Sequence, residues 1–262
     1  MNPKPAVLIT GASTGIGAVY ADRFARRGHD LVLVARDNAR LELLAERLRR
    51  EAGMRVDVRR ADVTSERDIA AVETRLREDT RIGVLVSNAG AALAGQFLDQ
   101  SSADVAGLIA LNVTALTRLT AAVAPRMAAT GEGSIINLAS VVGLAPELGM
   151  TVYGATKAFV LFLTQGLNLE LGSKGIYAQA VLPAATRTEI WERSGRDVEA
   201  LSAVMTTEEL VDAALVGFDR RETVTIPPLP DAGQWTAFDA ARLAMLPNFM
   251  QAHAAERYRT AV

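Results

Sequence analysis

A tyrosine and a lysine lie four residues apart in an otherwise apolar stretch, residues 150–171. If that stretch is helical, as its length and composition favour, Tyr153 and Lys157 share one face, a turn apart. A nearby positive charge favours the phenolate and lowers the pKa of a tyrosine, so that it can act as a general acid or base. The pair therefore predicts proton-transfer chemistry, but chance produces such a spacing often, and the rest of the chain must support it.

A glycine-rich stretch follows the first predicted strand directly. Residues 6–10 form a short apolar run, and Gly11, Gly15 and Gly17 lie between that run and a helical pattern at about residues 16–27. Glycines let a turn close and let the backbone approach a phosphate, while the helix N-terminus supplies free N–H groups and the positive end of its dipole. The alternative is an ordinary glycine-rich turn, but the position after the first strand favours dinucleotide binding.

Apolar strand-like runs alternate with amphipathic helical patterns along the chain. We expect strands at about residues 6–10, 31–35, 55–60, 82–86, 134–138, 176–182 and 223–226. Continuous apolar strands between helices predict a parallel sheet covered on both faces. The expected fold is α/β: one Rossmann-like, doubly wound, seven-stranded α/β/α domain over residues 1–262. It would include a mobile substrate-side segment at about 184–206 and a C-terminal helical tail at 231–262.

Several helix boundaries are also predicted. Asp37 is expected to cap the second helix, and Thr206 a helix at residues 207–218. A long helix is expected over about residues 102–130, bent or broken at Pro125.

The overall composition argues against several classes of protein. The 262 residues carry a net charge of −2 and no basic cluster, so nucleic-acid binding is not expected. The absence of cysteine and the separation of the two histidines, His29 and His253, argue against a metal site and suit a cytoplasmic protein. Lys157 and Glu170 within the most apolar helix favour a buried helix over a membrane span.

Taken together, the motifs resemble the short-chain dehydrogenase/reductase superfamily. In chain order they are Thr10–Gly17, Asp62-Val63, Asn88-Ala89-Gly90, Asn112, Ser140 and Tyr153-x-x-x-Lys157. The resemblance spans about residues 6–188 and implies an NAD(P)-dependent oxidoreductase that acts on an alcohol or carbonyl group.

The resemblance assigns catalytic roles to four residues. Tyr153 would give a proton to a carbonyl oxygen or remove one from a hydroxyl, and Lys157 would lower its pKa and hold the nicotinamide ribose. Ser140 would hydrogen-bond the reacting oxygen, and Asn112 would keep a water relay to Lys157 in place. Read alone, Ser140 is a strand-end turn residue and Asn112 a polar helix residue with a buried partner.

The resemblance also assigns the cofactor contacts. Asp62 would contact the adenine amino group, with Val63 against the ring, although Asp62 could instead cap the next helix. In the family's usual pattern the residue before Asn88 is an asparagine, whereas this chain has Ser87. The full set of cofactor-binding residues is Gly11, Ser13, Thr14, Gly15, Ile16, Gly17, Arg36, Asp62, Val63, Asn88, Ala89, Gly90, Tyr153, Lys157, Pro183, Thr186 and Thr188; no metal is required.

The end of the second strand bears on the choice between NAD and NADP. Family members that use NAD tend to have an acid at the position of Ala35, which Arg36 follows here. An arginine can pair with a 2′-phosphate, and no acid is present at that position to repel it. NADP(H) is therefore the expected cofactor, with NAD(H) possible. In the rival interpretation, Asp37 holds the ribose and Arg36 is a solvent-facing charge.

The expected substrate is a neutral, hydrophobic ketone, aldehyde or secondary alcohol. This follows from largely apolar expected walls at residues 91–93, 141–144, 146, 150, 184 and 190–191, where Arg187 is the nearby cation. One departure lies at Ala184, where the family usually has glycine and a left-handed backbone would disfavour alanine.

Other functions remain open from sequence. A cofactor-binding regulatory or scaffolding protein would usually lack Tyr153, Lys157 or Ser140, which this chain retains. An epimerase or dehydratase of the superfamily would usually have a larger C-terminal domain. The helix of Tyr153 is apolar on more than one stripe, which predicts a homodimer or homotetramer.

Overall fold

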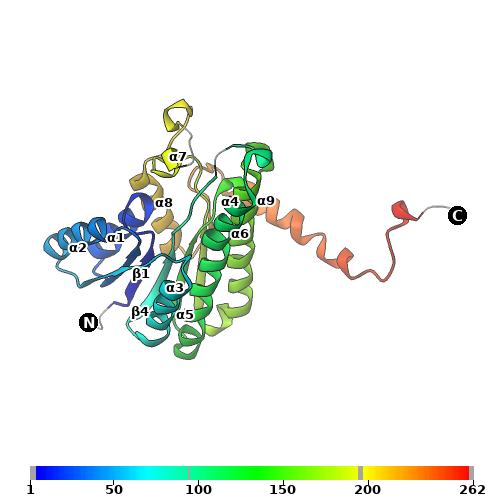
Figure 1. The fold of residues 1–262 in the computed structure, drawn as a ribbon. Coiled ribbons are helices and arrows are strands. Elements are labelled where there is room, and N and C mark those ends of the chain that lie inside the picture. The colour runs from blue at the N-terminus through cyan, green and yellow to red at the C-terminus, as the bar shows by residue number, and fades with distance from the viewer. Residues whose placement is uncertain (1–3, 94, 194–196, 260–262) are drawn as a thin grey trace. The chain divides into compact units, whose positions relative to one another are not determined.

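Seven parallel strands form one sheet in the order β3-β2-β1-β4-β5-β6-β7 (Figure 1). The computed structural model describes residues 4–93, 95–193 and 197–259. Most strands are apolar throughout and buried on both faces, which is why they form the middle layer. Their bounds are β1 Ala6–Thr10, β2 Leu31–Ala35, β3 Val56–Arg60, β4 Ile82–Ser87, β5 Gly133–Leu138, β6 Ile176–Val181 and β7 Val224–Thr225.

Helices cover both faces of the sheet and bury two apolar clusters against it. Helices α1 (Gly15–Arg26), α2 (Asn38–Ala52) and α8 (Thr207–Asp219) pack on one face, around Tyr20, Phe24 and Leu41. Helices α3 (Glu66–Glu78), α5 (Leu116–Thr130) and α6 (Thr151–Leu171) pack on the other, around Leu85 and Leu119. The predicted α/β/α architecture and the seven strands are confirmed.

The strand order reverses between β1 and β4. Strand β1 pairs with β2 on one side and with β4 on the other. The helices that follow β1 and β4 therefore leave toward opposite faces, and in such a sheet the ligand is expected to bind outside the carboxyl ends of these two strands. Thr10 ends β1 and Ser87 ends β4, so the glycine-rich stretch and the Asn88 motif meet at this point.

The long helix predicted over residues 102–130 is interrupted, but the interruption does not lie at Pro125. It consists of α4 (Ser102–Ile109), a π-helical segment (Ala110–Ala115) and α5, which continues through Pro125. The helix is therefore not broken at Pro125, a bend there stays a prediction, and the change of helix type surrounds Asn112. π-Segments widen a helix by one residue and are frequent at functional sites.

By length and composition alone, the stretch Ser102–Thr130 could cross a membrane; the mean hydropathy of its apolar window is 1.5, and 39% of that window is buried.

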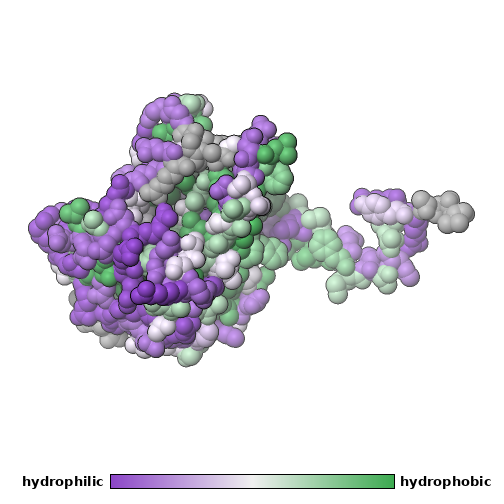
Figure 2. All heavy atoms as spheres, viewed as in Figure 1, coloured by the Kyte–Doolittle hydropathy of each residue, from purple (hydrophilic) through white to green (hydrophobic). Residues whose placement is uncertain are grey.

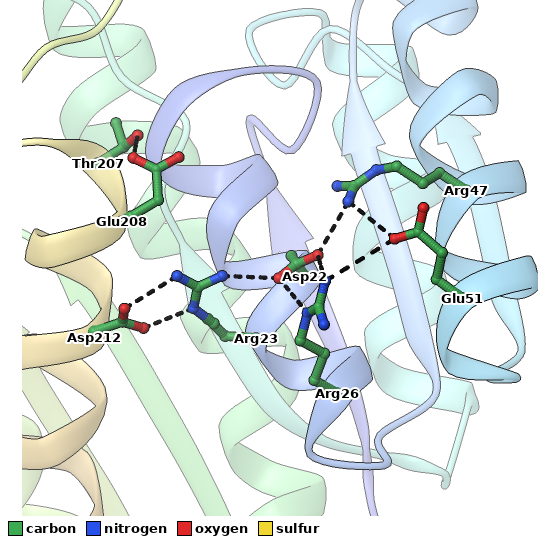
Figure 3. Close-up of polar contacts among 8 residues, drawn as sticks. All are labelled: Asp22, Arg23, Arg26, Arg47, Glu51, Thr207, Glu208 and Asp212. Carbon is green, nitrogen blue, oxygen red and sulfur yellow. Dashed lines mark hydrogen bonds and ion pairs between the residues drawn. The ribbon is translucent and has the colours of Figure 1, made fainter.

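Charged side chains join α8 to α1 and α1 to α2 (Figure 3). The buried carboxylate of Asp22 accepts hydrogen bonds from Arg23, Arg26 and Arg47. Arg23 also pairs with Asp212 on α8, with its Nε 2.6 Å from Oδ1. Helix α8 begins as predicted, because the Thr206 hydroxyl accepts from the Glu209 N–H at 3.1 Å. These contacts fix the helix that follows the predicted substrate-side segment.

Backbone hydrogen bonds join the two ends of the substrate-side segment between β6 and α8. The Met205 N–H donates to the Ala185 carbonyl, and the Arg187 N–H donates to the Met205 carbonyl, both at 2.9 Å. Between these points lies α7 (Ile190–Arg193), and residues 194–196 are outside the described part. Mobility of this segment stays a prediction. One 3₁₀ turn of the described chain lies in this segment, at Val198–Ala200, and others precede β6, at Phe97–Asp99, Val141–Gly143, Pro146–Leu148 and Gly172–Lys174.

The chain divides into two units at Pro227, and the second is residues 228–262. This unit contains α9 (Ala232–Leu243) and 3₁₀ turns at Leu246–Met250 and Glu256–Tyr258. Asp231 caps α9 by accepting from the Gly233 N–H at 2.8 Å. The helical tail expected from residue 231 is thus present over its described residues, which end at 259, while the single-domain interpretation stays a prediction.

Candidate active site

The stretch between β1 and α1 has the backbone of a tight phosphate-binding loop. Gly11 and Gly15 adopt positive φ angles of 65° and 55°, which side-chain-bearing residues rarely adopt. A Cβ on Gly17 would lie 2.3 Å from the Gly11 carbonyl oxygen, so only glycine fits there. Thr14, the N-cap of α1, makes no side-chain cap bond within the described structure. The first N–H groups of α1 are thus presented without a side-chain cap, as an anion site requires.

Asn88 and Thr10 tie this loop to the end of β4. Asn88 Nδ2 donates to the carbonyl oxygens of Thr10 and Gly11 at 2.9 and 3.1 Å. In return, the Thr10 hydroxyl accepts from the backbone N–H groups of Asn88 and Ala89. The expected contact of Asn88 with the cofactor stays a prediction; its observed contacts fix the glycine-rich loop through Thr10, the first residue of that motif.

Helix α6 brings Tyr153 and Lys157 together at the end of β5. Lys157 is buried, its Nζ donates to the Leu138 carbonyl oxygen at 2.7 Å, and it lies 5.6 Å from the centroid of the Tyr153 ring. Ser140, two residues after the end of β5, lies close enough to Tyr153 to favour its phenolate form, and its hydroxyl also donates to the Pro183 carbonyl oxygen. The structure thus brings together three of the four predicted catalytic residues.

The pKa values of this pair differ from the sequence prediction. Burial raises the pKa of Tyr153 to about 12, although the neighbouring Ser140 hydroxyl acts in the opposite direction. Burial also lowers the pKa of Lys157 to about 8. The predicted lowering of the Tyr153 pKa by Lys157 is therefore wrong for the protein alone, because loss of hydration disfavours the phenolate more than the polar neighbours favour it.

Asn112 and Lys157 both lie against Gly90. A Cβ on Gly90 would lie 3.4 Å from Asn112 Oδ1 and 3.6 Å from Lys157 Nζ. Asn112 exchanges two hydrogen bonds with the backbone of Ala91, and its Nδ2 also donates to the Thr156 hydroxyl at 3.1 Å. The π-helical segment positions this side chain. Thr156 was missed from sequence, although a hydroxyl next to Lys157 in an apolar helix was a signal.

The two candidate ribose groups at the end of β2 have different surroundings. Asp37 caps α2, with its Oδ1 accepting from the Arg40 N–H at 3.0 Å, as the sequence predicted. Arg36 is exposed and acts electrostatically on Asp62. Asp62 is not the N-cap of α3, which is Ser65; its Oδ1 instead accepts from the N–H and hydroxyl of Thr64. Val63 is buried beside it.

The stretch after β6 returns to the phosphate loop. The Pro183 carbonyl accepts from Ser140 Oγ at 3.2 Å, and a Cβ on Gly15 would lie 3.4 Å from the Thr188 methyl. Thr186 is buried, and its hydroxyl donates to the Ala184 carbonyl oxygen. Ala184 does not need a glycine: among the described non-glycine residues, only Met150 and Arg221 have a positive φ. The expectation of strain at Ala184 is therefore wrong.

A cavity of about 410 Å³ lies elsewhere, between α3 and α5. Its lining arginines are engaged by neighbouring groups: Arg118 pairs with Glu66 and Glu73, and Arg126 donates to the carbonyl oxygens of Leu76 and Ile82. None of the predicted catalytic residues lines this cavity, so we do not identify it with the active site.

Comparison with known proteins gives the same family as the motifs. A family model described as short chain dehydrogenase matches residues 5–199. A solved short-chain dehydrogenase from Sphingobium yanoikuyae, in complex with NADPH, is 65% identical with a TM-score of 0.96, covering 97% of this chain and 100% of that one. A bulky-bulky ketone specific alcohol dehydrogenase from Comamonas testosteroni is 59% identical with a TM-score of 0.92, covering 99% and 100%.

Curated relatives include enzymes named for two other substrates, sulfoacetaldehyde and a hydroxysteroid. Sulfoacetaldehyde reductase 2 of Chromohalobacter salexigens is 37% identical over 249 residues, which are 90% of this chain and 98% of the relative. The 17-beta-hydroxysteroid dehydrogenase type 3 of Rattus norvegicus is 36% identical over 184 residues, which are 69% of this chain and 60% of the relative.

Proposed function

The chain belongs to the short-chain dehydrogenase family, and from that premise we propose that it is an NADP(H)-dependent oxidoreductase of hydrophobic ketones and secondary alcohols. The observation that carries the proposal is the buried Lys157 Nζ, 5.6 Å from the centroid of the Tyr153 ring, with Ser140 beside them at the carboxyl edge of the sheet. A proton donor, a polar partner for an oxygen atom and a fixed positive charge thus lie together. The bare glycine backbone at the N-terminus of α1 fits the pyrophosphate of a dinucleotide.

Tyr153, Ser140 and Lys157 have different roles in ketone reduction. A bound nicotinamide supplies the hydride. Tyr153, protonated at neutral pH because its pKa is raised to about 12, holds the proton that the carbonyl oxygen takes up. Ser140 hydrogen-bonds the same oxygen and stabilises its developing negative charge. The Lys157 ammonium favours the phenolate that Tyr153 becomes once the proton has left.

The preference for NADP(H) is supported by the end of β2. Asp37 is engaged as the cap of α2 and pairs with Arg40, with its Oδ2 3.4 Å from Arg40 Nε. Arg36 is exposed and, among the described residues, is in no ion pair within 4.0 Å, so its guanidinium is available to a 2′-phosphate although its charge also acts on Asp62.

A hydrophobic substrate is supported by apolar side chains on the connections that leave the carboxyl edge of the sheet. Phe97, Leu98 and Leu148 are exposed on the turns that follow β4 and β5. Arg187, the cation that could recognise an anionic substrate, is paired with Glu199. A sulfonate such as that of sulfoacetaldehyde would therefore find this arginine already neutralised.

The test is steady-state reduction of a panel of ketones and aldehydes with NADPH and with NADH. We expect aryl and long alkyl ketones to be reduced with NADPH and sulfoacetaldehyde to be a poor substrate. Arg36→Ala should reduce the preference for NADPH by raising its KM. A wild-type protein that reduces these ketones better with NADH would refute the cofactor assignment, and one that prefers sulfoacetaldehyde would refute the substrate class.

We also propose that the chain forms at least a homodimer through α4 and α6. The two helices pack beside each other, and Figure 2 shows more hydrophobic surface over α4, α5 and α6 than over α1, α2 and α3. Phe162 and Leu169 on α6 are 77% and 85% exposed, which is unusual for large apolar side chains. Light scattering at micromolar concentration should give at least twice the mass of the chain, and Phe162→Glu should give less. A clean wild-type monomer would refute this proposal.

The absence of cysteine supports a cytoplasmic location.

A further inference from the structure

An ion pair joins the substrate-side segment to the helix that begins at the proposed 2′-phosphate site. Arg40 Nη1 donates to Glu189 Oε1 at 2.7 Å, across 149 positions of sequence. Arg40 lies in the first turn of α2, four residues after Arg36. Glu189 directly precedes α7. The contact therefore connects the part of the chain expected to choose the cofactor with the part expected to cover the substrate.

The path of the chain places this contact across the proposed cofactor site. Thr186 is fixed at the base of the segment by its bridge to Met205. Two residues on, the Thr188 methyl faces Gly15 in the phosphate loop, and the next residue, Glu189, reaches α2. The segment thus crosses from the catalytic side, past the phosphate loop, to the adenosine side.

A bound 2′-phosphate and the Glu189 carboxylate are like charges that would compete for the same arginine, Arg40. Arg36 lies directly after β2 and Arg40 in the first turn of α2, where Arg40 already pairs with the carboxylates of Asp37 and Glu189. A phosphate dianion attracts both guanidinium groups and is repelled by a carboxylate bound to one of them. The side chains of Arg40 and Glu189 are 48% and 35% exposed, and an ion pair this exposed is weak enough to exchange.

We infer that Arg40 exchanges Glu189 for the 2′-phosphate when NADP(H) binds, so that Glu189 is a specificity-determining residue that competes with the cofactor for Arg40. The inference rests on the proposed NADP(H)-dependent function. In the free protein, Glu189 holds the start of the substrate-side segment against α2. With the 2′-phosphate on Arg40, that attachment is lost, and the segment near α7 can rearrange around substrate.

The test compares 2′,5′-ADP with 5′-ADP, which differ only in the 2′-phosphate, by calorimetric titration. Glu189→Gln should bind 2′,5′-ADP about two- to fivefold more tightly than wild type, the range for removing one exposed ion pair, with 5′-ADP unchanged. Arg40→Ala should bind 2′,5′-ADP more weakly, again with 5′-ADP unchanged. Glu199→Gln is the matched control, because Glu199 is an exposed acid of the same segment that pairs with Arg187 rather than with α2; it should behave as wild type.

A second readout follows the segment itself. Hydrogen exchange of the amides of residues 188–192 should be faster in free Glu189→Gln than in free wild type. Addition of 2′,5′-ADP should speed exchange in wild type toward that of the variant, and 5′-ADP should not.

The outcomes separate the inference from the function on which it rests. If wild type prefers 2′,5′-ADP but Glu189→Gln binds it no more tightly, the competition is refuted and the NADP(H) assignment stands. If wild type shows no preference for 2′,5′-ADP over 5′-ADP, the NADP(H) assignment itself fails. If Glu189→Gln tightens both nucleotides equally, the effect does not involve the 2′-phosphate and the inference is overturned.

Discussion

A single methyl group at Gly17 should damage both the stability of the protein and its affinity for the cofactor. In Gly17→Ala the added Cβ would lie 2.3 Å from the Gly11 carbonyl oxygen and 2.5 Å from Asn88 Nδ2, where real Cβ contacts are essentially never below 3.0 Å. The first of these neighbours is backbone and cannot swing away, and the second holds the loop to β4. Relief of the clash must therefore displace the loop.

The magnitude follows from two opposing effects. Overpacking of this kind costs up to about 3 kcal/mol, and replacing a helical glycine with alanine returns up to about 1 kcal/mol. A net loss of about 2 kcal/mol would lower the Tm by roughly 4–8 °C for a domain of this size. Losing one hydrogen bond to a charged phosphate, worth about 1.5–3 kcal/mol, would weaken NADPH binding by about 10- to 100-fold.

Thermal unfolding and NADPH titration measure these two effects, with Gly107→Ala as the control. Gly107 is a helical glycine of α4 around which no described atom would lie within 4 Å of an added Cβ. That variant should be as stable as wild type or more so, with unchanged affinity. A Gly17→Ala protein with wild-type Tm and NADPH affinity would refute the tight-loop reasoning, and lost stability with unchanged affinity would show that the loop does not hold the phosphates.

Three further predictions concern the catalytic helix and its support. Ketone reduction should fall as the pH rises through about 8, because Lys157 then loses the proton whose charge favours the Tyr153 phenolate; a pH profile that is flat to pH 10 would contradict this. Asn112→Leu should cost about 1–3 kcal/mol in denaturant unfolding, since it leaves the partly buried backbone groups of Ala91 without their partner; a cost below about 0.5 kcal/mol would contradict that support. Met150 precedes α6 with φ at 61°. The Met150→Gly protein should be more stable than wild type by about 0.5–1 kcal/mol, and the Met150→Val protein should be less stable. Equal Tm values for the two variants would argue against backbone strain at this position.

Periodicity was sufficient to predict the fold, because its signals are local. Strands buried on both faces must be apolar throughout, and their bounds were correct to within about one or two residues. The caps at Asp37 and Thr206 were predictable for the same reason, since a cap depends on three or four consecutive residues. The meeting of the glycine-rich stretch with the Asn88 motif follows from the parallel sheet.

The features that sequence could not give depend on distant or subtle geometry. The π-helical segment around Asn112 has no pattern distinct from an apolar α-helix, so the irregularity was assigned to Pro125 instead. The pKa of Tyr153 was predicted from one neighbour, whereas burial, which sequence does not quantify, determines its direction. Arg40 and Glu189 are ordinary exposed charges in sequence, and their contact exists only through the tertiary path of the segment after β6.

Replacement of the Tyr153 hydroxyl tests the central claim most directly. Tyr153→Phe keeps the ring and removes the proton donor, so ketone reduction with NADPH should fall by about 10²- to 10⁴-fold while NADPH binding stays within a few-fold of wild type. Tyr20→Phe is the matched control, because the Tyr20 hydroxyl is buried with no hydrogen-bond partner in the described structure, and that variant should retain full activity. Wild-type reduction rates in Tyr153→Phe would contradict the assignment of Tyr153 as the general acid.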